Sequence, residues 1–108
     1  MIKTYARRAG DRFCLLVTGH AEANAEGGRV CAAVSVLVTM LIHHARESEA
    51  CRHVRAHRES GSCSLSCTGD FGEIFERVLK TLDALAVGHP THMARVAYLS
   101  DQKREEIT

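Results

Sequence analysis

The sequence predicts an α+β fold: a single small domain in which two helices pack on a mixed sheet, in the order ββαββαβ. Two observations support this prediction. Short apolar segments occur in pairs around turn residues, and two longer segments carry apolar residues at helical spacing. The chain has 108 residues, enough for one modest core but not for two, so we expect one domain over residues 1–108.

The strands are predicted in two hairpins. The first covers residues 2–8 and 12–18, with turn residues at 9–11, and both faces of its second strand are largely apolar. We therefore expect that strand in the interior of the sheet. The second hairpin covers residues 51–68, and the alternation of apolar residues with serines over 62–67 indicates a sheet with one solvated side.

Two helices follow the hairpins. The first is predicted over residues 30–49 and is apolar almost all round for its first three turns, which is typical of a central helix packed on more than one side. The glycine pair 27–28 argues against an earlier start. The second carries an apolar stripe between Phe71 and Leu85, with Asp70 as its predicted N-cap, and the breakers at 88–90 end it.

Three segments complete the chain. A last strand is predicted over residues 91–99 and a polar tail over 101–108. The first strand of the second hairpin carries Arg and His residues between positions 52 and 58, and we interpret it as a solvated edge strand protected from aggregation by its charge. A role for this basic strand in binding substrate or ribosome is the open alternative.

Composition limits the possible partners and the location. Apolar residues make up 45% of the chain and the net charge is +1, so neither nucleic acid nor a membrane is expected as a partner. The longest apolar run, residues 30–42, is too short to span a bilayer, and residues 1–5 contain no signal-peptide core. We expect a cytoplasmic protein whose five cysteines are reduced thiols.

His20 and Cys31 are the candidate catalytic pair. His20 follows the interior strand, and Cys31 falls in the first turn of the predicted helix. A thiol must lose its proton to attack a carbonyl, and both a nearby imidazole and a helix N-terminus favour that. Free N–H groups of the first turn could also stabilise an oxyanion, and Ser35 lies one turn further along. From spacing alone, a buried Cys31 with no catalytic role is the open alternative.

Two separated blocks resemble the signature of the ribosomal-processing cysteine protease Prp family. They are Gly19–Ala21 and Val30–Ala32, the second followed by Ser35. The family signature reads Gly-His-Ala, a short loop, and then Asp-Ile-Val-Cys-Ala-x-x-Ser at the head of a helix. The resemblance implies a cytosolic, homodimeric endopeptidase that uses no cofactor. Its expected partner is the precursor of the twenty-seventh large-subunit ribosomal protein, whose N-terminal extension it removes after an aromatic pair in support of ribosome assembly.

The resemblance also assigns roles to residues of this chain. Cys31 would be the nucleophile, and His20 would be the general base and later the general acid. Gly19, Ala32 and Ser35 match family positions next to these two residues and would support them. The loop between the catalytic residues would be mobile and would gate the site.

One position departs from the family signature. An acidic residue is expected three positions before the cysteine, where this chain has Gly28, followed by Arg29. Either the acid is dispensable, or the substrate preference has shifted, or the activity is weakened. Glu22 and Glu26 are nearby acids that could replace it, although loop carboxylates are usually only solvated.

Two further readings stay open. A divergent homologue could cut another protein or cut slowly, and a small regulatory protein could bind metal or exchange thiols without hydrolysing anything. The tightest metal-like clusters are Cys63 with Cys67 and His43 with His44. On a strand the two cysteines would lie roughly 13 Å apart, too far for one ion, so we predict no metal site.

Overall fold

The computed structural model describes residues 1–99, and the predicted polar tail at 101–108 lies outside these described residues. The element order is ββαββαβ, as predicted. The strands are β1 (Lys3–Ala9), β2 (Arg12–Thr18), β3 (Cys51–Glu59), β4 (Ser62–Gly69) and β5 (Ala97–Leu99), and the helices are α1 (Ala25–Glu47) and α2 (Gly72–Gly88).

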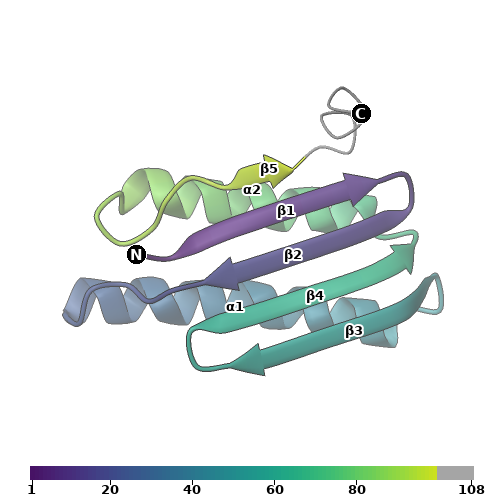
Figure 1. Cartoon of the computed structure of the whole chain (residues 1–108), viewed down its shortest axis with the longest axis horizontal. Coiled ribbons are helices and arrows are strands. Elements are labelled where there is room, and N and C mark those ends of the chain that lie inside the picture. The colour runs from purple at the N-terminus through teal and green to yellow at the C-terminus, as the bar shows by residue number, and fades with distance from the viewer. Residues whose placement is uncertain (100–108) are drawn as a thin grey trace, which may run out of the picture.

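The five strands form one mixed sheet in the order β3-β4-β2-β1-β5 (Figure 1). β2 is the central strand and pairs antiparallel with both β1 and β4, which confirms the predicted interior strand. β3 lies at one edge, so the basic strand is an edge strand. β5 is the only parallel neighbour within residues 1–99, and it pairs with β1.

Both helices cover the same face of the sheet (Figure 1). On β2, Phe13, Leu15 and Val17 point towards the helices and are buried, whereas the residues between them are exposed or half-buried. Phe13 makes edge contacts with Phe71 and Phe75 of the α2 region, at ring-centroid distances of 5.6 Å and 5.2 Å. The opposite sheet face has no covering layer in the described part of the chain, which confirms a sheet with one solvated side.

α1 begins at Ala25, so the predicted start at residue 30 is wrong. Asn24 caps the helix: its side-chain oxygen accepts a hydrogen bond from the N–H of Gly27 at 2.8 Å. The glycine pair does not break the helix. Gly27 is instead required where the chain packs closely against the first turn. A Cβ at that position would collide with the carbonyl oxygen of Glu22, which folds back over the first turn.

α1 presents one buried stripe rather than an apolar surface hidden on all sides. Val30, Val34 and Val38 face the core, but Val36 is 68% exposed and Met40 46% exposed on the outer face. By length and composition alone α1 could cross a membrane, a test that the core helix of a soluble protein can also pass. In this structure its inner stripe belongs to the same core as the buried sheet residues.

Two smaller predictions about the second half of the chain are wrong. Asp70 is not the N-cap of α2; Phe71 occupies that position and makes no side-chain capping bond, because its buried ring carries no oxygen or nitrogen acceptor. The last strand is only Ala97–Leu99, not residues 91–99. The preceding segment turns through hydrogen bonds within residues 89–93 and does not extend along β1 for its full length.

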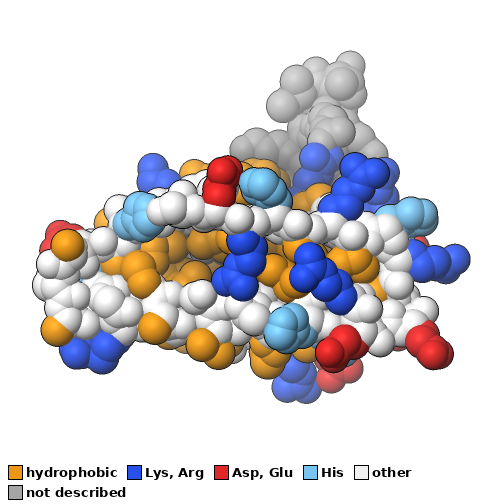
Figure 2. Space-filling view, turned by 90° about the horizontal axis from the view of Figure 1, so that it is seen from below, with side chains coloured by type: hydrophobic (Ala, Val, Ile, Leu, Met, Phe, Trp, Pro, Cys, Tyr) orange, Lys and Arg blue, Asp and Glu red, His pale blue; other side chains and the backbone are white. Residues whose placement is uncertain are grey.

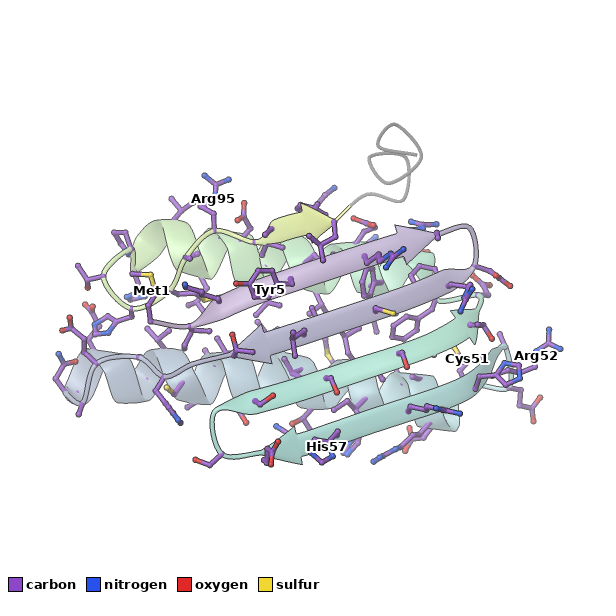
Figure 3. All side chains as sticks on the ribbon, in the orientation of Figure 1. Met1, Tyr5, Cys51, Arg52, His57 and Arg95 are labelled. Carbon is purple, nitrogen blue, oxygen red and sulfur yellow. The ribbon has the colours of Figure 1, made fainter. Side chains whose placement is uncertain are left out.

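The segment before β5 is fastened to α2 by Asp83. Its carboxylate accepts hydrogen bonds from the guanidinium of Arg95 at 2.8 Å and 2.6 Å and from the N–H of Val96 at 2.9 Å. Figure 3 labels Arg95 beside this segment. These donors, Arg95 first, hold the pKa of the Asp83 carboxyl below its usual range.

A lowered carboxyl pKa in the folded state predicts an acid-dependent loss of stability. The contribution of Asp83 is complete above the ordinary aspartate pKa and disappears as the pH falls through the lowered folded value. We expect Asp83→Asn to be less stable than the wild type near neutral pH and to lose less stability on acidification. Thermal unfolding between pH 7 and pH 2 measures both effects.

Glu73→Gln is the matched control for Asp83→Asn. It removes a carboxylate from the exposed pair of Glu73 with Arg77 on the same helix, and such pairs contribute little to stability. Its unfolding curve should follow that of the wild type across the pH range. An Asp83→Asn protein with the wild-type acid slope would contradict the assignment.

Candidate active site

His20 and Cys31 line the same cavity, which has a volume of about 240 Å³. It lies where the end of β2, the second turn of α1 and the turn between β3 and β4 meet. The cavity wall also includes the following residues: Ile2, Val17, Gly19, Val34, Ser35, Val38, Arg58, Glu59, Gly61, Ser62 and Cys63. The structure therefore brings together two residues that the sequence separates by a loop and a helix start.

The end of β2 is fixed to the β3–β4 turn. The N–H of Gly19 donates to the carbonyl oxygen of Gly61 at 2.9 Å. Gly19 has a φ of +90° and packs against the carbonyl of Met1, which Figure 3 labels at the start of the first strand, so a side chain at Gly19 would collide with that backbone. This junction sets the direction in which the exposed imidazole of His20 leaves the strand.

The imidazole of His20 lies directly over Gly61. Gly61 has a φ of +78°, a backbone conformation that favours glycine, and a Cβ there would lie 2.8 Å from Nε2 of His20. The glycine thus serves two purposes: it permits the turn, and it leaves space for the ring. No hydrogen bond joins His20 to Cys31 in the part of the chain that the structure describes.

Cys31 is half-buried in the second turn of α1, so the expectation that it occupies the first turn is wrong. Its N–H lies inside the regular hydrogen-bonding of the helix and is not free for an oxyanion. The N–H groups of Gly27 and Gly28 are occupied as well, since both donate to Asn24. The helix-start donors that the sequence predicted are therefore not available at the thiol in this conformation.

Arg58 joins the edge strand β3 to α1 beside the cavity. Its guanidinium donates to the hydroxyl of Ser35 at 3.1 Å and to that of Thr39 at 2.7 Å. Figure 2 shows this edge of the molecule, where hydrophobic side chains form the floor of a furrow and Lys or Arg side chains extend across it. Ser35 thus lies at the cavity, whereas Ala32 is exposed on the α1–α2 side and does not line it.

Glu22 and Glu26, the two nearby acids that could replace the missing one, do not line the cavity. Glu26 turns away from Cys31, and its Oε2 lies 2.7 Å from Nε2 of His92. The acid in the cavity wall is Glu59, at the end of β3, whose carboxylate also lies 3.4 Å from the exposed ring of His57. The carboxylate in the cavity wall therefore comes from β3 and not from the segment between His20 and Cys31.

Of the other cysteines, Cys63 also lines this cavity, whereas Cys14, Cys51 and Cys67 do not. Burial raises the pKa of the Cys63 thiol, with Arg58 partly opposing the effect, and burial next to Cys51 raises that of Cys67 to about 11. Both therefore remain protonated near neutral pH. Cys14 is exposed on the open sheet face, outside this cavity. Residues 1–99 contain no group of three or more His, Cys, Asp or Glu side chains placed to hold a metal ion.

The β3–β4 hairpin contributes residues that the sequence did not connect with His20 and Cys31: Glu59 and Gly61, together with Arg58, considered only as part of a basic strand, and Cys63, considered only as a metal ligand. Their proximity to His20 depends on the pairing of β4 with β2, in which Thr18 lies opposite Ser62. The turn signal at Gly61 was visible in the sequence, but its role beneath an imidazole depends on tertiary structure.

Comparison with known proteins gives a match in structure but not in sequence. No protein-family model and no curated protein sequence matches the chain. Among solved structures, SMU.848 from Streptococcus mutans is 21% identical with a TM-score of 0.70, covering 94% of this chain and 99% of that one. The ribosomal processing protease Prp from S. aureus, with a covalently linked product peptide, is 16% identical with a TM-score of 0.73, covering 92% and 100%.

A second structure of the S. aureus protease, with a substrate peptide, gives a TM-score of 0.72 at 15% identity and the same coverage. At these identities the similarity establishes the fold, over nearly the whole of each chain. The chain thus has the fold of a ribosomal processing protease, and a His–Cys pair lines one of its cavities.

The contact between Gly61 and His20 predicts a specific effect of Gly61→Ala. The left-handed backbone should cost roughly 1 to 2 kcal/mol in stability, and the new methyl group should displace the His20 ring. We expect the NMR signals of the His20 imidazole to shift in this variant.

Gly10→Ala is the matched control, because Gly10 sits in the other hairpin at a φ of +60° with no atom near its Cβ position. It should lose similar stability without moving the His20 signals. Equal responses of His20 in the two variants would show that the ring does not depend on Gly61.

Proposed function

We propose that the protein is a cytoplasmic cysteine endopeptidase with Cys31 as nucleophile and His20 as general base and acid. Its proposed substrate is a large-subunit ribosomal protein, the twenty-seventh, from which it removes an N-terminal extension after an aromatic pair. The observation that carries the proposal is the convergence of His20 and Cys31 on one cavity. The resemblance of the motifs around both residues, and the fold shared with a ribosomal processing protease, support it.

The proposed reaction proceeds through an acyl-enzyme. His20 takes the proton of the Cys31 thiol, and the thiolate attacks the scissile carbonyl carbon. His20 then gives the proton to the leaving amine, which departs with the C-terminal part of the substrate. Water, deprotonated by the same imidazole, hydrolyses the thioester and restores the thiol. No metal or cofactor takes part in these steps.

The hydrogen-bond donors for the oxyanion must be groups that line the cavity in this conformation. The guanidinium of Arg58 and the hydroxyl of Ser35 both line it and already contact each other. A charged donor with several N–H groups in the same cavity wall as the thiol suits a developing negative charge on a carbonyl oxygen. We therefore assign oxyanion stabilisation to Arg58, with Ser35 as its neighbour in the cavity wall, in place of the N–H groups of the helix start.

The direct test is incubation with an N-terminally extended ribosomal protein that carries an aromatic pair, followed by intact mass. The wild type should release the extension. Cys31→Ala should release none, and His20→Ala should be slower by roughly 10²- to 10⁴-fold, the usual contribution of a general base. Cys14→Ser, altered on the open sheet face, should cut at the wild-type rate. Cleavage by Cys31→Ala would refute the assignment.

Alkylation separates the protease from the thiol- or metal-binding alternative. Iodoacetamide should modify Cys31 rapidly at mildly acidic pH in the Cys14→Ser background, and His20→Ala should slow this reaction at least about tenfold. Cys63 and Cys67 should react slowly because burial raises their thiol pKa values. Protection of several cysteines together would instead favour a metal or redox protein. Alkylation at Cys31 without cleavage would favour a divergent homologue with another substrate.

We further propose that the enzyme is a homodimer joined through the outer faces of its helices. An apolar groove of about 670 Å³ runs between α1 and α2 and includes Val36, which is 68% exposed. The open sheet face is also apolar, but Arg55 and His57 border it. A two-fold contact there would bring copies of the same basic groups together, which disfavours it.

The helix-face dimer predicts that Val36→Asp yields a monomer, because each interface would contain two buried carboxylates. Analytical ultracentrifugation at micromolar concentration measures the effect. The matched variant Leu16→Asp on the sheet face should leave the dimer intact. Dissociation by Leu16→Asp alone would place the interface on the sheet.

A further inference from the structure

His92 is a buried histidine outside the cavity, and both of its ring nitrogens have partners. The residue is 2% exposed. Its Nδ1 accepts a hydrogen bond from the backbone N–H of Glu22 at 3.2 Å, and its Nε2 lies 2.7 Å from Oε2 of Glu26. Because Nδ1 accepts a hydrogen bond and Nε2 donates one, these contacts fit a ring that carries its hydrogen on Nε2.

Both partners of His92 belong to the segment that separates His20 from Cys31. Glu22 lies in the loop, and Glu26 lies in the first turn of α1. Between them, the N–H of Asn24 donates to the carbonyl of Glu22 at 2.9 Å. The ring of His92 therefore attaches both the loop and the helix start to the segment that follows α2.

The backbone of His92 also fixes the wall of the cavity. Its carbonyl accepts the N–H of Ile2 at 2.9 Å, and the N–H of Ala94 donates to the carbonyl of Ile2 at 2.9 Å. Ile2 lines the cavity together with His20 and Cys31. One residue thus holds the start of β1 through its main chain and the loop through its side chain.

We propose that His92 is a positioning residue for the catalytic pair. This inference rests on the proposed protease function. Its side chain fixes the position of residues 22–26. This segment in turn sets the relative positions of His20 and Cys31 in the cavity. A change that removes the Nδ1 acceptor leaves the buried N–H of Glu22 without a partner and releases the loop.

The groups around the ring come from the loop, from α1 and from the segment that follows α2. Glu26 on α1 faces Nε2, and the Nδ1 of His89, which has no hydrogen-bond partner, lies 3.7 Å from the same Glu26 oxygen. On the loop side, the main-chain N–H of Glu22 faces Nδ1.

Two substitutions separate the two ring nitrogens. In His92→Asn the side-chain oxygen takes a place near that of Nδ1 and keeps an acceptor for Glu22. In His92→Gln the longer amide reaches towards Glu26 and leaves the N–H of Glu22 without an acceptor. Glu26→Gln is the matched control, because it keeps an oxygen acceptor for Nε2 and removes only the charge. All are measured in the full chain with Cys14→Ser, after thermal unfolding confirms that each is folded.

The first readout is hydrogen exchange of the Glu22 amide, which does not depend on activity. We expect exchange about tenfold faster in His92→Gln and near the wild-type rate in His92→Asn and Glu26→Gln. Unchanged exchange in His92→Gln would overturn the proposal.

The second readout is the rate of Cys31 alkylation and the kcat and KM for peptide cleavage. His92→Gln should lower the alkylation rate and kcat about tenfold with little change in KM, and His92→Asn should restore most of the loss. Equal losses in the Asn and Gln variants would indicate a merely structural role and overturn the proposal. If Cys31 alkylation in the wild type does not depend on His20, the protease assignment fails, while Glu22 exchange still decides whether His92 holds the loop.

Discussion

The burial of alternate residues on β2 is the constraint on which the rest of the molecule depends. Phe13, Leu15 and Val17 face the helices, and β2 pairs with β1 on one side and β4 on the other. A shift of one residue in the pairing of β2 would turn these side chains to solvent. It would affect the pairing with β1 and the pairing with β4 alike. The register therefore fixes where β2 ends, and that end carries His20 to the turn at Gly61.

The elements could be predicted from the sequence because their patterns are local. Strand alternation and the apolar stripe of α2 predicted the element order, the interior strand and the edge strand. Each of these patterns involves only residues that are close in the sequence. The start of α1 was missed because Gly27 looks like a breaker in isolation. Its real constraint is the carbonyl of Glu22 folded against it, although Asn24 was available as a capping signal.

The candidate site was predictable only in part, for the same reason. His20, Cys31 and Ser35 were found through a motif, whereas Arg58, Glu59 and Gly61 reach the cavity through strand pairing. The placement of Cys31 in the second turn changes the chemistry that can be assigned to it. In the proposed protease mechanism, activation of the thiol and oxyanion binding are therefore assigned to side chains at the cavity rather than to the helix terminus.

Identities of 15–21% with solved structures over nearly complete chains show how few residues this fold prescribes. What persists is the pattern of buried and exposed positions, and many apolar residues of similar volume satisfy it. The hydrogen-bonded anchor at His92 is of another kind, since it depends on particular atoms and not on volume. Such contacts can differ between proteins of one fold and can set their individual properties.

The parallel pairing of β1 with β5 has a consequence for the order of events during synthesis. The first strand can form its hairpin with β2 early, but the partners of Ile2 lie at residues 92–94, near the other end of the described chain. A cavity wall that contains Ile2 is therefore completed only after those residues have left the ribosome. A nascent chain that already carries both His20 and Cys31 would still lack this cavity wall until residues 92–94 are free to pair with Ile2.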